Sequence, residues 1–218
     1  MLEELREAVW EQNLALPKNH LVTATSGNVS GRDGSTGLVV IKPSGVEFDK
    51  LRPGDLNVVS LDGKVVEGDF APSVDTAAHL YVYRHMPEVN GIVHTHSPYA
   101  TSFAVLGQTI PICMTTIASE FGARVPVSDF ATIGGEDIGK EIVKKIGACP
   151  AILMRNHGVF TVGPTVTAAV KAAIMLEEAA KTVHLAMLRG KVEELPKDVI
   201  ERAFEFYYKK YGQRGAHG

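Results

Sequence analysis

Apolar residues recur along the chain at two spacings, one typical of helices and one typical of buried strands. Helical spacing runs through residues 2–15 and again through residues 165–189. Short apolar runs, such as residues 151–154, have the length of buried strands. We expect helices over residues 2–15, 74–85, 98–106, 136–146, 165–189 and 196–211. We expect strands over residues 38–41, 57–61, 64–67, 91–96, 151–154 and 159–162.

Turn and cap residues set the expected ends of several elements. Asp62-Gly63 suits a two-residue turn that joins two strands into a hairpin. Ser73 is expected to cap the helix over residues 74–85. Pro164 suits the first turn of the long helix, and Gly190 suits its end.

Helices and hairpins follow one another without a regular strand–helix–strand rhythm. The pattern therefore predicts one α/β domain over residues 1–218, with three α/β/α layers around a mixed or antiparallel sheet. A tail of about residues 212–218 is expected to follow the last helix.

Composition is typical of a single globular domain. The chain has 218 residues, of which 45% are hydrophobic, and a formal net charge of −3. The near-neutral charge and the lack of a basic cluster argue against nucleic acid as a partner. No apolar run approaches the roughly 18 residues that a membrane span needs. Two cysteines do not resemble a disulfide framework in a chain of this size, so we expect a cytoplasmic protein.

The strongest chemical signal is the triplet His94-Thr95-His96 at the end of an expected strand. Residues two apart on a strand point to the same side, so these two imidazoles can face one point. His157 follows a second apolar run. Three histidines at strand ends are typical of a catalytic metal site with an open position, although a single histidine is more often a surface residue.

Small polar turns supply candidate anion contacts. Residues 25–30 and 42–45 combine glycine, serine and asparagine, whose backbone N–H groups and side chains suit a phosphate, with Lys42 adding charge. Each segment alone is more often only a turn. Asp75 has two interpretations, either a favourable charge in the first turn of its helix or a carboxylate near the metal.

Taken in order, these segments resemble the class II aldolase/epimerase family. The resemblance covers about residues 3–190. The segments that carry it are Ser26-Gly27-Asn28-Val29-Ser30, Lys42-Pro43-Ser44-Gly45, Pro72-Ser73-Val74-Asp75, His94-Thr95-His96-Ser97, Asn156-His157-Gly158 and Leu176-Glu177-Glu178.

Three positions are similar to the epimerase branch of that family. They are Asp75, where aldolases carry glutamate, the pair Thr115-Thr116, and the C-terminal Tyr211. The resemblance implies interconversion of L-ribulose 5-phosphate and D-xylulose 5-phosphate. Because the carbon to be inverted has no acidic proton, the C3–C4 bond would break by a retro-aldol step and form again.

The resemblance also implies roles for individual residues. A divalent metal, most simply zinc but with manganese or cobalt possible, would bind His94, His96 and His157, with Asp75 as ligand or base. Asp75, Glu120 and Tyr211 would move protons. The sugar phosphate would contact Gly27, Asn28, Lys42, Ser44, Gly45, Ser73, Val74 and Thr115. The family implies a homotetramer with sites at subunit interfaces.

Some positions depart from the epimerase pattern. Ser119 stands where an acidic proton carrier is expected, and Glu120 is the neighbouring carboxylate. Val74 replaces a second serine in the phosphate turn. Tyr207, Tyr208 and His217 compete with Tyr211 in the C-terminal segment.

Two other functions stay open. One is an aldolase of the fuculose-phosphate kind or a related sugar-phosphate lyase, which would accumulate two fragments. The other is a metal-binding structural or adaptor domain without turnover.

Truncation after Lys210 tests the proton carrier at Tyr211. We expect loss of epimerisation while metal content and tetramer are retained, because only the tail carrier is removed. Turnover, metal content and size-exclusion elution of the truncated protein are the measurements. Unchanged turnover would rule Tyr211 out.

Overall fold

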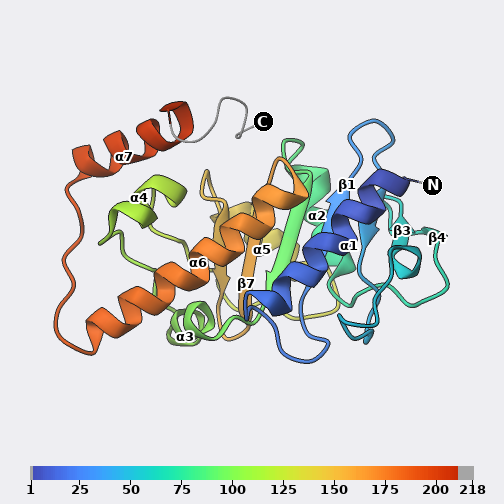
Figure 1. Ribbon diagram of the computed structural model, residues 1–218, viewed down its shortest axis with the longest axis horizontal. Helices are drawn as coiled ribbons and strands as arrows, with labels where there is room; N and C mark the ends of the chain where they lie inside the picture. Colours follow the sequence, from blue (N-terminus) through green and yellow to red (C-terminus); the bar gives the residue numbers. More distant parts are fainter. Residues whose placement is uncertain (1, 211–218) are drawn as a thin grey trace.

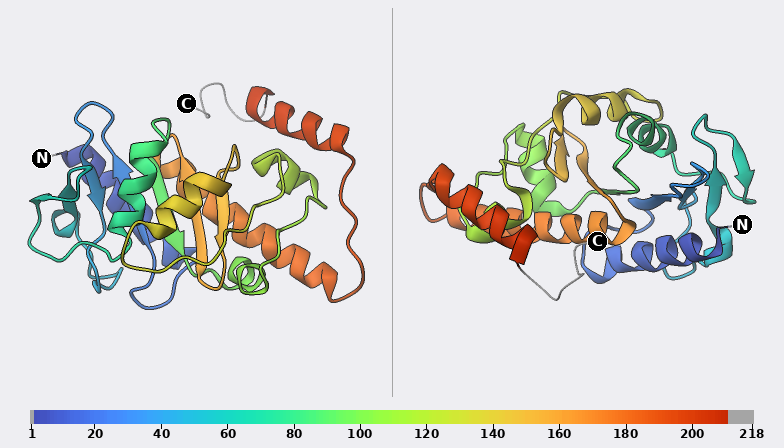
Figure 2. Two further views of the ribbon diagram at one scale, coloured as in Figure 1. Left: turned by 180° about the vertical axis from the view of Figure 1, so that it is seen from behind. Right: turned by 90° about the horizontal axis from the view of Figure 1, so that it is seen from above.

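The structure is a computed structural model that describes residues 2–210. Within that range a seven-stranded sheet lies between two layers of helices (Figures 1 and 2). The strands are β1 (Asn28–Arg32), β2 (Val39–Ile41), β3 (Asn57–Val59), β4 (Val65–Glu67), β5 (Gly91–Thr95), β6 (Ala151–Met154) and β7 (Gly158–Gly163). The helices are α1 (Glu3–Lys18), α2 (Thr76–His85), α3 (Pro98–Leu106), α4 (Thr115–Phe121), α5 (Asp137–Lys145), α6 (Val166–Met187) and α7 (Lys197–Lys210), with a 3-10 turn over Pro53–Asp55.

All neighbouring strands are antiparallel. Their order is β4-β3-β2-β1-β5-β7-β6, so β5 lies between β1 and β7. The three-layer α/β domain predicted from the sequence is confirmed, and of the two sheet types left open the antiparallel one is found.

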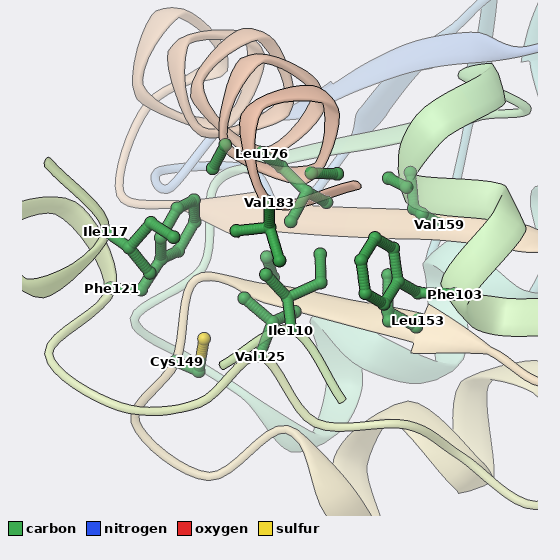
Figure 3. Close-up of a cluster of buried hydrophobic side chains, with 14 of the residues drawn as sticks. Phe103, Ile110, Ile117, Phe121, Val125, Cys149, Leu153, Val159, Leu176 and Val183 are labelled. Atoms are coloured by element: carbon green, nitrogen blue, oxygen red, sulfur yellow. The ribbon is translucent and has the colours of Figure 1, made fainter. Parts of the chain in front are cut away.

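Helices α2 and α5 cover one face of the sheet, and α1 and α6 cover the other (Figure 2, right). Tyr83 and Ile138 belong to the apolar cluster on the first face, and Val9 and Val170 belong to the cluster on the second. A third cluster extends the second layer beneath α3 and α4, where Phe103, Phe121 and Val183 pack together (Figure 3).

Strand β1 is an element that the apolar pattern does not predict, because residues 25–30 read as a polar turn. Val29 packs in the core beneath α1 and α6. Asn28 and Ser30 point to the opposite face, where they hydrogen-bond to side chains at the start of α2 and along it. The polar residues of this strand are therefore satisfied by tertiary contacts. Helix α4 is a second element that the sequence pattern does not predict.

Several expected boundaries are wrong by a few residues. Asp75, not Ser73, is the N-cap residue of α2, which begins at Thr76, and the hydroxyl of Thr76 donates to the Ser73 carbonyl at 2.6 Å. Pro164 precedes the long helix and does not lie in its first turn, because Thr165 caps the helix and its side chain accepts from the Ala168 N–H at 3.1 Å.

The hairpin between β3 and β4 forms, but its turn is longer than predicted. The Ser60 N–H donates to the Lys64 carbonyl at 2.9 Å, so residues 61–63 lie inside the turn. Gly63 takes a φ of +91°, which glycine adopts readily. In the part of the chain that the structure describes, no helix is long and apolar enough to cross a membrane.

Close packing of α6 against the start of β5 depends on Gly91. A β-carbon at this position would lie 2.4 Å from the Thr165 carbonyl oxygen and 2.6 Å from the Val166 α-carbon. Both are backbone atoms at the beginning of α6, so they cannot make room by rotating as a flexible side chain could. We expect Gly91→Ala to lower the free energy of unfolding by about 1–3 kcal/mol or more, the usual cost of overpacking.

Urea denaturation of Gly91→Ala measures this cost. Gly34→Ala is the matched control, because a β-carbon there meets nothing within 4 Å. Equal midpoints for the two variants would contradict the packing argument.

Candidate active site

Three histidine side chains meet at one end of strands β5 and β7. His94 lies on β5, His96 follows the last residue of that strand, and His157 precedes β7. One ring nitrogen from each lies within 4.8 Å of the others. The turn before β7 allows this approach because Asn156 takes a left-handed φ of +58°.

Gly158 lets the histidines come close to one another. A β-carbon at this position would lie 2.5 Å from the Thr95 carbonyl oxygen and 2.6 Å from His96 Cδ2. The glycine after His157 is therefore part of the geometry of the site.

The donor atoms fit a divalent metal. His94 Nδ1 donates to the Val159 carbonyl at 2.9 Å, which leaves the lone pair of Nε2 pointing toward His96 Nε2 at 3.1 Å. Zinc–nitrogen bonds of about 2.0–2.1 Å at a tetrahedral angle place two ligand nitrogens about 3.3 Å apart. His157 Nδ1 is buried and has no hydrogen-bond partner among the described residues.

Burial keeps the three imidazoles in the form that binds metal. It lowers the pKa of His94 to about 3 and lowers the pKa values of His96 and His157. The rings are therefore neutral at pH 7, and a neutral imidazole has a lone pair free for coordination.

Asp75 precedes α2 and faces the same site. Its Oδ2 accepts from Asn28 Nδ2 at 2.8 Å and from the Ser73 hydroxyl at 3.4 Å. Burial works to raise the pKa of Asp75, but the neighbouring imidazoles and the Asn28 hydrogen bond outweigh it and hold that pKa below its usual value. The carboxylate is thus ionised beside the histidines, and its role as a metal ligand stays a prediction, since it is not part of the three-histidine cluster.

A cleft of about 310 Å³ opens beside the histidines. It includes every residue predicted for the metal and all the predicted phosphate contacts except Thr115. The lining residues are Thr25, Ser26, Gly27, Asn28, Lys42, Pro43, Ser44, Gly45, Ser73, Val74, Asp75, His94, His96, Ile133 and His157.

Two glycines shape the polar turns at the wall of the cleft. Gly27 has a φ of +83°, and a β-carbon there would lie 2.9 Å from the His94 carbonyl oxygen. Gly45 has a φ of +68°, and a β-carbon there would meet nothing within 4 Å. The absence of a side chain at Gly27 therefore lets this turn pack against the backbone of β5. Gly45 borders open space that a ligand could fill.

Lys42 brings a buried ammonium to the cleft. Its side chain is 1% exposed, its Nζ lies 3.3 Å from the Pro43 carbonyl oxygen, and the charge sits 4.7 Å from the centre of the Phe48 ring. Burial lowers the pKa of Lys42 to about 8. The contacts described for this ammonium are carbonyl oxygens and an aromatic ring, not a carboxylate. The charge is therefore suited to pairing with a bound anion.

Two predicted residues lie on α4, away from the cleft. Glu120 is 6% exposed, and its Oε2 lies 3.5 Å from Lys171 Nζ on α6. The same ammonium contacts the hydroxyl of Tyr207 on α7. Thr115 is exposed at the start of α4. Within one chain, Glu120 of α4 and Tyr207 of α7 thus both contact Lys171 of α6. The role of Glu120 as a proton carrier toward a neighbouring subunit stays a prediction. Tyr211 lies outside the described residues.

Ile133 lines the cleft although nothing in its sequence context marks it. It is 68% exposed, in the loop before α5. The sequence pattern also misses the buried polar residues Ser30 and His79, which lie behind Asp75. The signal that was available for them is the alternation of polar residues along residues 28–30.

Comparison with known proteins supports one family. Residues 7–184 match the model for the class II aldolase and adducin N-terminal domain. A solved L-fuculose 1-phosphate aldolase is 29% identical, with a TM-score of 0.89 over 94% of this chain and 96% of that chain. The L-fuculose-1-phosphate aldolase from Thermus thermophilus is 27% identical, with a TM-score of 0.74 over 88% and 98% of the two chains. A sugar-phosphate aldolase from Thermotoga maritima, at 22% identity and a TM-score of 0.72 over 89% and 99%, shares the fold.

The lowered pKa of Lys42 predicts pH-dependent anion binding. The affinity for inorganic phosphate should fall by up to about tenfold per pH unit as the pH rises above 8, because Lys42 then loses its proton. Isothermal titration of phosphate between pH 7 and 10 measures this dependence. Lys42→Met should bind phosphate weakly without this pH dependence, whereas Lys64→Met, at an exposed lysine, should behave as wild type.

Stability gives an independent check on the same lysine. The folded-state pKa lies below the ordinary value of 10.5, so the cost of burying the charge is greatest below pH 8 and fades as the pH rises toward 10.5. Lys42→Met should therefore gain stability relative to wild type at pH 7 and lose that gain near pH 10.5. An equal difference at both pH values would contradict the assignment.

Proposed function

Because this chain belongs to the class II aldolase and adducin N-terminal domain family, we propose that it is a metal-dependent enzyme that reversibly cleaves a carbon–carbon bond in a ketose phosphate. The observation that supports this most is the pairing of two features in one cleft. Three imidazole nitrogens converge at one end, and the buried Lys42 ammonium and the Gly45 turn lie along its wall.

Different residues of the cleft would contact the phosphate and the sugar carbonyl of the substrate. Lys42, the backbone around Gly45 and the Ser73 hydroxyl are placed to bind the phosphate. The sugar carbonyl and its neighbouring hydroxyl would then lie toward His94, His96 and His157. A divalent metal held there, most simply zinc, would act as a Lewis acid and stabilise the negative charge that develops beside the breaking bond.

Asp75 is placed to accept the proton that the reaction releases. In aldol cleavage the hydroxyl proton of the carbon that becomes the aldehyde leaves, the C–C bond breaks, and the electron pair moves to the carbonyl fragment. Both described hydrogen bonds to the carboxylate reach Oδ2, so Oδ1 is available as the acceptor. Asn28 holds the carboxylate in place for this transfer.

The aldolase outcome is supported by the two solved L-fuculose 1-phosphate aldolases that the chain resembles over most of its length. Epimerisation of L-ribulose 5-phosphate is the second candidate. Asp75 favours it, because the epimerase branch carries aspartate where aldolases carry the longer glutamate. The two outcomes share C–C cleavage and differ in whether the aldehyde leaves or turns and rejoins. A homotetramer in the cytoplasm, with interface residues completing the site, belongs to the same proposal.

Product analysis tests the function and separates the two outcomes. The metal-loaded protein is incubated with L-fuculose 1-phosphate and, separately, with L-ribulose 5-phosphate. We expect dihydroxyacetone phosphate and an aldehyde to accumulate from the first substrate. Formation of D-xylulose 5-phosphate from the second, without free fragments, would establish the epimerase instead.

His96→Ala tests the metal site, because His96 is the most exposed of the three histidines and its loss leaves the core intact. Bound metal and turnover should fall together to background, as measured by elemental analysis and by the product assay. Full metal content in this variant, or full activity after chelation of the wild type, would refute the metal-dependent reaction.

A further inference from the structure

A line of buried polar side chains runs behind the cleft, between β1 and α2. Asn28 and Ser30 lie two apart on β1, so they share one face of the sheet. Asp75 and His79 lie one helical turn apart, and the backbone N–H of His79 donates to the backbone carbonyl of Asp75 at 3.0 Å. The two pairs face each other across the layer, Asn28 with Asp75 and Ser30 with His79.

The inner pair is joined by Tyr83 into a hydrogen-bonded group of three side chains. Ser30 Oγ lies 2.7 Å from His79 Nδ1 and 2.8 Å from the Tyr83 hydroxyl. Ser30 and His79 are fully buried, and Tyr83 is 1% exposed. This unit fixes the imidazole of His79 through one nitrogen.

The ring of His79 also reaches a metal-ligand candidate through one aromatic side chain. Phe160 stands directly opposite His94 in the β5–β7 register. Its ring stacks on His94 with centroids 4.3 Å apart and an interplanar angle of 20°. His79 meets the same Phe160 ring edge-on, with centroids 5.6 Å apart. The side chain of His79 therefore reaches His94 through Phe160, whereas its bond to Asp75 is made by the helix backbone.

Packing alone does not require an imidazole at this position. His79 Nε2 is buried and has no partner among residues 2–210. A buried nitrogen without a hydrogen bond costs about 1–3 kcal/mol, and an apolar side chain of similar size would avoid that cost. Core packing therefore does not explain why the side chain at position 79 is an imidazole.

We propose that His79, held by Ser30, is a positioning residue that sets the orientation of the His94 ring in the active site through Phe160. The inference rests on the proposed metal-dependent function of that site. A ring anchored at Nδ1 by Ser30 supports the Phe160 ring edge-on. When this anchor is lost, the His94 ring keeps its hydrogen bond to the Val159 carbonyl but loses the fixed position of the Phe160 ring that stacks on it.

Four variants separate positioning from general stability. His79→Leu removes both ring nitrogens, and Ser30→Ala removes the anchor and keeps the ring. His79→Asn keeps a hydrogen-bonding atom close to the place of Nδ1. Thr161→Val is the control, because it removes a buried hydrogen bond, Thr161 Oγ1 to the Ala169 carbonyl at 2.7 Å, that does not contact this line of residues.

The visible absorption spectrum of the cobalt-loaded protein reports ligand geometry without turnover. We expect His79→Leu and Ser30→Ala to bind cobalt with shifted bands, His79→Asn, which keeps the anchor but not the ring, to shift the bands less than His79→Leu, and Thr161→Val to keep the wild-type bands. On the sugar phosphate, kcat of His79→Leu should fall about 10- to 100-fold, as for other residues that orient metal ligands. KM should change by less than about threefold, and His79→Asn should recover kcat to within about fivefold of wild type.

Wild-type bands and kcat in both His79→Leu and Ser30→Ala would overturn the proposal, and so would the same losses in Thr161→Val. Thermal unfolding is recorded for each variant. If His79→Leu does not fold, Ser30→Ala decides alone, since it removes only a hydroxyl. If the wild type turns over no sugar phosphate, the proposed function fails, while the cobalt spectra still decide the role of His79.

Discussion

The antiparallel register of β5 between β1 and β7 is the constraint on which the site depends. It places Asn28, His94 and Phe160 side by side in one row on the face that α2 covers. A shift by one residue would turn the His94 ring to the face of α1 and α6 and bring Val93 to the metal site. The buried pairing of apolar neighbours in these strands, such as Ile92 opposite Val162, opposes such a shift.

Close backbone approach is the second requirement, and it limits three positions to glycine. Gly158 lies against the histidines, Gly27 lies against β5, and Gly91 lies against the start of α6. Each removes a side chain where two segments must meet. The ligands are therefore held by strand ends and tight turns rather than by long loops, which favours a rigid site.

The electrostatics of the cleft cost stability. Burial disfavours the charged forms of the His94 and Lys42 side chains, and it leaves nitrogens of His157 and His79 without partners in the described part of the chain. A metal would compensate the histidines of the cleft and a phosphate would compensate Lys42, whereas His79 lies behind the cleft. This arrangement matches the proposed reaction, in which charge develops at the sugar carbonyl while the phosphate stays bound.

The sequence alone was sufficient for the features that depend on local spacing. These are the two facing imidazoles of a His-x-His pair, the glycine turns, the long α6 helix and the order of motifs that indicates the family. Tertiary structure decided the features that join residues far apart in the chain. It made β1 a strand because Asn28 and Ser30 find partners at α2, and it put Glu120 beside Lys171 of α6. The contacts of His79 with Ser30 and Phe160 span three separate elements, and no periodicity in the sequence encodes which elements become neighbours.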